Sequence, residues 1–209
     1  MKSALLRAGT GVLAAAALAL AFTPPASAAA YDITYDCQAD TPLGAQTATL
    51  NQTVDATAPA TVAPGGALDL VVDPAPGQVP SEVSGYEVKE VHTFALKVPV
   101  PSNSTLTGVD LTGGSGLGPT PPTWSESGGV VTVSFTGPMP GGSTFELPTV
   151  TAHLTAGPTG TIDSTLYGTS YDDPGLTFTT VVSTFLGEIS APTSCFPNPN
   201  PVLTTTTIG

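Results

Sequence analysis

Apolar and polar residues alternate along most of this chain, and clusters of glycine, proline, asparagine and aspartate interrupt the alternation at short intervals. Residues 33–37 (ITYDC) and 131–135 (VTVSF) are examples. Successive side chains of a β-strand point to opposite faces of a sheet, so this period of two gives each strand one apolar and one polar face. Similar alternating sets recur along the chain and predict about nine or ten strands and no helix after residue 30. They lie at 48–54, 68–72, 86–100, 106–111, 150–154, 162–166 and 176–189.

A sheet built from such strands packs on one side and faces water on the other. We therefore predict an all-β fold, an antiparallel β-sandwich of the immunoglobulin-like type, with a closed barrel as the alternative. One immunoglobulin-like module needs about 100 residues. Because this chain is longer, it either carries additional strands or consists of two fused sub-sandwiches.

Residues 1–30 have the parts of a secretory signal peptide: a basic start, an apolar core and small residues before a cleavage point. The apolar core at 11–22 (GVLAAAALALAF) is shorter than the roughly 20 residues that span a bilayer. Cleavage is expected after Ala28 or Ala30. We predict a mature protein that is secreted, or associated with the cell surface, and that has no transmembrane segment.

The chain has two cysteines, Cys37 near the start of the mature protein and Cys195 near its end. In an exported protein such an even pair predicts a disulfide. The chain-entropy model assigns up to about 5 kcal/mol to a cross-link that closes so long a loop. We therefore expect one closed β-sandwich domain at 31–196, followed by a Pro/Thr-rich C-terminal tail at 197–209 that buries little surface.

Charge narrows the range of partners. Removal of the signal peptide takes away Lys2 and Arg7, which leaves Lys89 and Lys97 against sixteen acidic residues and a net charge near −14. Such a protein cannot neutralise a phosphate backbone, so nucleic acid is excluded as a partner. Anionic lipid headgroups are disfavoured for the same reason. The expected partner is an unknown protein, glycan or envelope component.

Several segments are similar to known sequences. Residues 60–72 (ATVAPGGALDLVV) resemble the entry of bacterial extracellular immunoglobulin-like modules, in which a Pro-Gly turn precedes an apolar strand. Residues 94–154 resemble a later part of such modules, with VPVPSNSTLTGVDL, then GGVVTVSF, then GPMPGGSTFELPTVTAHL. With its early YDC and late CFP, the mature chain resembles uncharacterised secreted β-sandwich proteins of high-GC Gram-positive bacteria. The resemblance implies an immunoglobulin-like fold and brings no catalytic residues with it.

Candidates for catalysis are few. By parity His92 shares the face of Phe94 and Leu96, where we expect a partly buried side chain. His153 falls on the opposite parity from its apolar neighbours, which predicts a solvent-facing side chain. The segment 113–117 (GGSGL) lacks the final glycine of a nucleophile elbow. We therefore expect that the protein is not an enzyme and that it has no catalytic residue and no cofactor.

Two weaker site candidates remain. Asp172 and Asp173 stand in a Tyr-Asp-Asp-Pro-Gly turn, whose oxygens are suited to Ca²⁺, although aspartate in turns commonly bonds its own backbone. Trp124 follows a Pro-Pro-Thr sequence and is a candidate for a ligand-binding face or for a core plug. The Gly- and Pro-rich stretch 113–123 predicts an irregular loop.

Three classes of function fit these features. The first is a secreted or envelope-associated, non-enzymatic binding or structural module. The second is a carrier of an apolar ligand or lipid held between two sheets, which an apolar pocket lined from both sheets would distinguish. The third is an extracellular hydrolase, which requires His92 or His153 beside a serine or threonine and an acid in an open cleft.

Overall fold

The computed structural model describes residues 27–42, 44–185 and 187–209. Most of the predicted signal peptide lies outside these ranges. Within them, no helix is long and apolar enough to cross a membrane, and the regular structure consists of strands. The strands are β1 (Ser27–Thr41), β2 (Gly44–Ala58), β3 (Thr61–Val62), β4 (Ala67–Pro74), β5 (Gly77–Gln78), β6 (Glu82–Val83), β7 (Tyr86–Pro99), β8 (Ser104–Thr112), β9 (Thr123–Ser127), β10 (Val130–Phe135), β11 (Met139–Pro140), β12 (Thr144–Phe145), β13 (Thr149–Ala156), β14 (Gly160–Ser164), β15 (Leu176–Thr184), β16 (Gly187–Pro197) and β17 (Thr204–Ile208).

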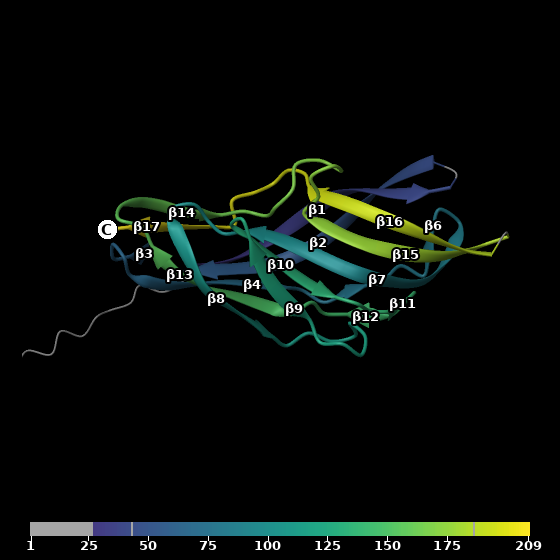
Figure 1. The fold of residues 1–209 in the computed structure, drawn as a ribbon, viewed down its shortest axis with the longest axis horizontal. Coiled ribbons are helices and arrows are strands. Elements are labelled where there is room, and N and C mark those ends of the chain that lie inside the picture. The colour runs from purple at the N-terminus through teal and green to yellow at the C-terminus, as the bar shows by residue number, and fades with distance from the viewer. Residues whose placement is uncertain (1–26, 43, 186) are drawn as a thin grey trace, which may run out of the picture.

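The main sheet is a single antiparallel path in the order β8-β13-β4-β2-β1-β16-β15-β7-β10-β9, with β6 and β11 beside β7. Figure 1 shows this sheet rolled around the long axis of the molecule. Its two ends meet through side chains, because Val109 of β8 and Val150 of β13 pack against Val131 and Val133 of β10. The predicted all-β, antiparallel class is confirmed, and it takes the form of one rolled sheet.

Two small sheets complete the fold. β5 pairs with β12, and β14, β17 and β3 form a three-stranded sheet in which β17 and β3 are parallel. In Figure 1 the three-stranded sheet lies at the end of the molecule that carries the C-terminus, and the tip of the β15–β16 hairpin lies at the other end.

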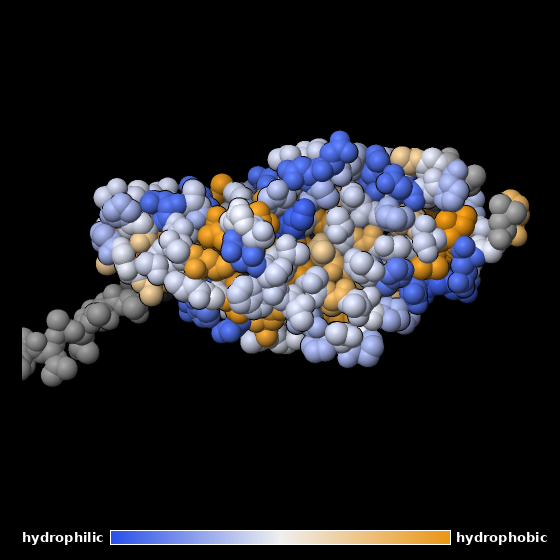
Figure 2. Space-filling view, in the orientation of Figure 1, coloured by the Kyte–Doolittle hydropathy of each residue, from blue (hydrophilic) through white to orange (hydrophobic). Residues whose placement is uncertain are grey.

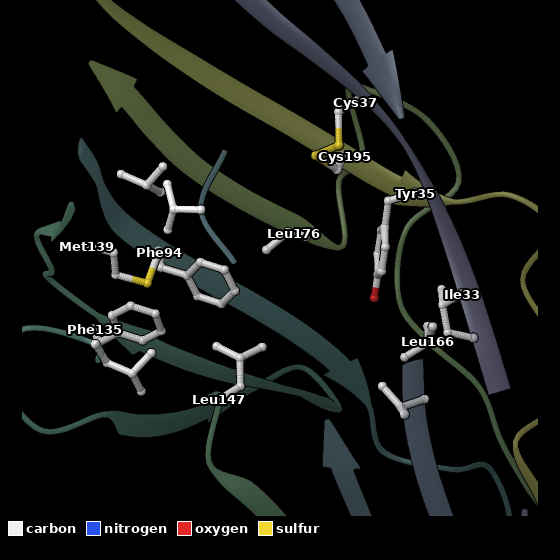
Figure 3. Packing of buried hydrophobic residues seen from close by; sticks show 14 of the residues in the cluster. Ile33, Tyr35, Cys37, Phe94, Phe135, Met139, Leu147, Leu166, Leu176 and Cys195 are labelled. Atoms are coloured by element: carbon white, nitrogen blue, oxygen red, sulfur yellow. A yellow bond between two sulfur atoms is a disulfide. The ribbon is translucent and has the colours of Figure 1, made fainter. Parts of the chain in front are cut away.

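The alternation in the sequence places the expected side chains in the core. On β1, Ile33, Tyr35 and Cys37 are 1%, 5% and 4% exposed, and the residues between them are only partly buried. They belong to the main core inside the rolled sheet (Figure 3). A second core lies between the three-stranded sheet and β4 and β13. Its members are Ala58, Val62, Leu68, Leu70, Leu154, Ala156, Ile162 and Ile208.

The C-terminal segment 197–209 is not a tail that buries little, which corrects the sequence prediction. β17 pairs with β14 and β3, and Leu203, Thr206 and Ile208 are 2%, 1% and 7% exposed. The Thr206 hydroxyl donates to the carbonyl of Pro59 at 2.7 Å. A run of threonines carries no apolar alternation, so the pattern gave no sign that one of them is fully buried.

Residues 113–122 are irregular, as predicted for the stretch 113–123, but they are also anchored, since Leu117 is 5% exposed within the main core and Ser115 exchanges two backbone hydrogen bonds with Glu146. One further sequence prediction differs from the structure. The segment 176–189, predicted as one long strand, forms β15 and the start of β16, which pair as a hairpin. Gly187 provides the turn with a φ of 114°, and a single glycine is a weak turn signal.

A bulge in β7 breaks the parity on which the placement of His92 depended. Val91 and Phe94 are both buried although they are three positions apart, an odd spacing that alternation would place on opposite faces. Between them Thr93 has a left-handed φ of 55°, and the register with β15 shifts at this point. Val91 therefore takes the inward position that parity assigned to His92, and the prediction that His92 shares the face of Phe94 is wrong. His92 is half-buried.

Candidate ligand-binding cavity

A cavity of about 420 Å³ lies against the inner face of the main sheet. The main sheet forms one side of the cavity with residues of β1, β2, β7, β15 and β16. Residues of the small β5–β12 sheet form part of another side. Its lining is mainly apolar, and includes Leu50, Val88, Phe94, Met139, Phe178 and Val182. A pocket of this size and lining is typical of small-molecule sites, which span about 300–1,000 Å³.

None of the described residues that line this cavity carries a charge. Exposed lining residues, among them Gln46 and Ala48 of β2 and Tyr86 of β7, mark the side that opens to solvent. Figure 2 shows hydrophobic residues at the surface towards the end of the molecule that carries the β15–β16 hairpin, bordered by hydrophilic residues.

Exposed acidic residues lie near the lining in sequence but are not part of it. Asp40, Glu82, Glu87 and Glu188 are each next in sequence to a residue that lines the cavity. Lys89 lies 2.9 Å from Glu87. The charges in these segments are therefore outside the described lining, which is neutral.

A smaller cavity of about 90 Å³ lies deeper in the main core. Leu50, Gln52, Phe94 and Phe145 line both cavities, so the two spaces adjoin. The amide nitrogen of Gln52 donates to the carbonyls of Thr53 and Ala75, which fixes this side chain at the junction. The residues that line the smaller cavity, within the described ranges, are also uncharged.

Tyr35 lines the smaller cavity and is 5% exposed. Figure 3 shows its hydroxyl pointing away from the disulfide and into the space between the core side chains. Burial raises the pKa of the Tyr35 phenol above its ordinary value of 10.0, because the charged form loses its hydration. The group is therefore a neutral hydroxyl throughout the physiological range.

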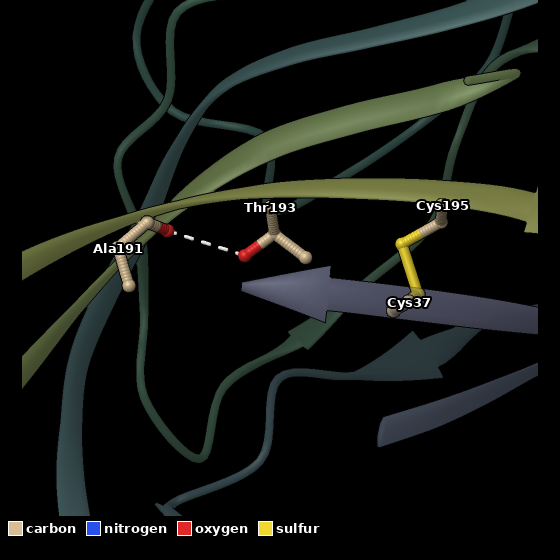
Figure 4. Close-up of a disulfide and its surroundings, with 4 residues drawn as sticks. All are labelled: Cys37, Ala191, Thr193 and Cys195. Carbon is tan, nitrogen blue, oxygen red and sulfur yellow. Dashed lines mark hydrogen bonds between the residues drawn. A yellow bond between two sulfur atoms is a disulfide. The ribbon is translucent and has the colours of Figure 1, made fainter. Parts of the chain in front are cut away.

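The predicted disulfide between Cys37 and Cys195 is present. The two residues are direct partners in the β1–β16 pair, and their Cα atoms are 4.1 Å apart. Both are buried, and Cys37 lines the larger cavity. Figure 4 shows the bond beside Thr193, whose hydroxyl donates to the carbonyl of Ala191 at 3.2 Å. The disulfide therefore fixes the strand pair that forms one wall of the cavity.

His153 links two carboxylates from neighbouring strands. Its Nδ1 lies 2.7 Å from Oδ1 of Asp69 on β4, and its Nε2 lies 3.0 Å from Oδ2 of Asp110 on β8. Both hydrogen bonds raise the pKa of the imidazole above 6.5, because they favour the doubly protonated ring. The bond to Asp69 contributes most to this rise. A ring with both nitrogens bonded in this way has no free site for the proton of a nucleophile. The side chain is 37% exposed, as its parity predicts, but its two partners were not foreseen.

His92 makes a different contact. Its Nδ1 lies 2.7 Å from the hydroxyl of Thr93, the next residue along β7. Neither His92 nor His153 is among the residues that line the two cavities. The arrangement that a hydrolase requires, with histidine, hydroxyl and acid together in an open cleft, is thus not assembled around these two cavities.

The calcium candidates lie in a turn before β15. The Asp173 carboxylate accepts a hydrogen bond from Thr169 at 3.3 Å and another from the hydroxyl of Tyr167, which raises the pKa of Tyr167. Its backbone N–H bonds to Ser170. Asp172 is exposed. Across the described ranges no three His, Cys, Asp or Glu side chains stand together so as to hold a metal ion.

Trp124 lies on the edge strand β9, opposite Val133 of β10, and is 41% exposed. It is therefore neither a loop residue nor a core plug. It does not line either cavity, so the structure does not bring it together with the apolar site. Its role in a ligand-binding face stays a prediction.

No pattern in the sequence indicated the cavities directly. The inward positions of Tyr35, Cys37 and Leu50 follow from alternation, but the pattern says only that these side chains leave the solvent. Whether inward side chains meet or leave space depends on how far the sheet curls, and that is a property of the whole path of strands. A run of small inward residues on paired strands, such as Ala191 and Thr193 on β16, is the local signal that was available.

No protein-family model and no curated protein matches the chain. Among solved structures, the chain is similar to the crystal structure of a presumed membrane-anchored protein from Corynebacterium diphtheriae, with a TM-score of 0.59 and 20% identity. The match covers 87% of this chain and 38% of the other, so the chain spans less than half the length of that protein. At this level of identity the similarity extends to the fold.

Proposed function

We propose that this protein is an exported, envelope-associated or secreted binding protein that holds an apolar ligand in the cavity inside its rolled sheet. The observation that carries the proposal is the cavity of about 420 Å³, with an apolar, uncharged lining drawn from two sheets. For scale, a dry apolar cavity of about 150 Å³ is large enough to bind benzene. Filling the larger space with apolar atoms would remove a correspondingly larger apolar surface from water.

The proposal places the protein outside the cytoplasm, with the segment 1–30 as its signal peptide. The disulfide supports this location, because such bonds persist in oxidising compartments. The similarity to a presumed membrane-anchored protein agrees with a role at the cell envelope.

Within this proposal the protein is not an enzyme. His153 is occupied by Asp69 and Asp110, and His92 contacts Thr93. Both histidines lie outside the two cavities in which a ligand would be held. We also propose that the three-stranded sheet packed on β4 and β13 is the immunoglobulin-like part of the fold, a view supported by the shared second core.

The experiment that tests ligand binding is a titration of the exported, oxidised protein with N-phenyl-1-naphthylamine, a neutral apolar dye that fluoresces when it leaves water. We expect saturable binding of one dye per chain. The variant Ala191→Phe should weaken it by about tenfold or more, equivalent to about 1.4 kcal/mol. Ala191 lines the cavity and is 4% exposed, so the larger side chain would occupy the ligand space.

The matched control is Ala67→Phe, the same substitution at an exposed strand position outside both cavities. It should bind the dye as the wild type does. Near-ultraviolet circular dichroism establishes that each variant is folded. If Ala191→Phe does not fold, Val182→Trp fills the same cavity from a half-buried position. The proposal fails if the wild type shows no saturable binding, or if folded cavity-filling variants bind as tightly as the wild type.

A further inference from the structure

The hydroxyl of Tyr35 differs from the other buried hydroxyls. Ser164 bonds to Thr204 at 2.7 Å, and Thr193 and Thr206 each donate to a backbone carbonyl. In the part of the chain that the structure describes, no hydrogen bond reaches the hydroxyl of Tyr35, although the residue is 5% exposed. Buried polar groups in folded proteins nearly always have a partner, so a buried hydroxyl without one requires an explanation.

The explanation lies in the space beside it. No buried side-chain nitrogen or oxygen in the described ranges is sealed from accessible space without a partner. The Tyr35 oxygen therefore borders open space, and that space is the smaller cavity that Tyr35 lines. Its neighbours there include Leu147, Leu166 and Leu176, which offer no hydrogen bond from their side chains. Gln52 and Ser164, which also line this cavity, bond to protein groups, whereas the Tyr35 hydroxyl has no such partner among the described residues.

We propose that the Tyr35 hydroxyl is the anchor for an uncharged lipid-like molecule with one hydroxyl or carbonyl oxygen, which enters oxygen first. This inference rests on the proposed function. The oxygen of the ligand would meet Tyr35 in the smaller cavity, and its apolar chain would run past Phe94 and Phe145 into the larger one. Both phenylalanines line the two cavities, so a ligand that occupies both would pass these rings.

The ligand is uncharged because nothing in the site compensates a charge. In the part of the chain that the structure describes, neither cavity has a charged lining residue, and burying an ion without a partner is far more costly than burying a neutral oxygen. A free fatty acid is thus disfavoured inside the site.

Tyrosine suits this role because its hydroxyl both donates and accepts. It donates to a carbonyl, and it donates to or accepts from a ligand hydroxyl. A neutral hydrogen bond contributes about 1 kcal/mol net, which corresponds to about a fivefold preference for a ligand that has the oxygen.

The test is displacement of N-phenyl-1-naphthylamine from the wild type and from Tyr35→Phe, by 1-decanol, n-undecane and decanoate. Decanol and undecane have the same number of non-hydrogen atoms, so they differ by the oxygen. For the wild type we expect decanol to bind about fivefold more tightly than undecane, and decanoate to be the weakest. In Tyr35→Phe the preference for decanol over undecane should disappear.

The melting temperature of the empty protein separates an anchor from a structural residue. Tyr35→Phe should be at least as stable as the wild type, because it removes a hydroxyl that bonds to no protein group. If Tyr35→Phe retains the decanol preference, or if decanoate is the tightest ligand, the inference is wrong while dye binding still supports the cavity. If the dye does not bind at all, the proposed function itself fails.

Discussion

The imidazole Nδ1 of His153 lies 2.7 Å from a carboxylate oxygen of Asp69 on the adjacent strand β4. With Asp110 on the other side, one side chain connects three neighbouring strands on the outer face of the sheet. The pair is a charge-assisted contact when the ring is protonated and an ordinary hydrogen bond when it is not.

This contact predicts a dependence of stability on pH. Because the folded state raises the pKa of His153 above 6.5, the stabilisation is fully present below that value and is lost as the pH rises through the folded pKa. The difference in melting temperature between the wild type and His153→Gln should be largest near about pH 6 and vanish near about pH 9. NMR titration of the ring should give a pKa above 6.5. A pKa below 6.5, or a difference that grows with pH, would contradict the assignment.

Removal of the disulfide should destabilise the fold without altering its class. Cys37 and Cys195 close a loop with a sequence separation of 158, and both are buried. We expect the double variant Cys37→Ala, Cys195→Ala to lose about 2–5 kcal/mol in urea unfolding. Reduced wild type is the control and should lose a similar amount. A loss well below 1 kcal/mol in both would show that the cross-link adds little to the pairing of β1 with β16.

The C-terminal strand should be essential for stability. Ile208 is 7% exposed in the second core, and Ile208→Ala should cost about 2–4 kcal/mol, because it leaves a cavity against Leu68 and Leu154. Val202 belongs to the same segment but is 50% exposed, so Val202→Ala should change the free energy of unfolding by less than about 0.5 kcal/mol. Equal costs for the two variants would mean that β17 does not dock as described.

Asn103 should be sensitive to the identity of its replacement. It adopts a left-handed φ of 63°, and its amide donates to the carbonyls of Thr159 at 2.6 Å and Thr161 at 3.3 Å. Asn103→Gly loses the two hydrogen bonds and keeps the backbone freedom, and should cost about 1–2 kcal/mol. Asn103→Ala should cost about 1 kcal/mol more, because alanine is strained at positive φ. Thermal unfolding of both variants checks the order, and a more stable alanine variant would refute it.

The sequence predicted those features that depend on local alternation. The inward faces of β1 and β10 and the pairing of Cys37 with Cys195 follow from period and compartment, and the structure has all three. Parity failed at His92, since one bulged residue exchanges inward and outward positions for the rest of a strand.

The cavities and the contacts of His153 could not be predicted from the sequence, for a different reason. Alternation identified Tyr35 as inward, but its missing hydrogen-bond partner depends on where Leu147, Leu166 and Leu176 arrive from distant parts of the chain. The contacts of His153 likewise require β4 and β8 to flank β13, an order that no local pattern specifies. Burial can be anticipated from a strand, whereas an empty space is defined by all the strands around it.

The pairing of Cys37 with Cys195 also bears on how the protein matures. With two cysteines in the chain, there is one possible intramolecular pairing, so a thiol–disulfide isomerase has no scrambled monomer to correct. The disulfide forms only after β16 has been synthesised and has paired with β1. Oxidation of Cys37 therefore indicates that this wall of the cavity is assembled. The incorrect products that remain are cross-links between two chains, and these would increase with the concentration of the newly exported protein.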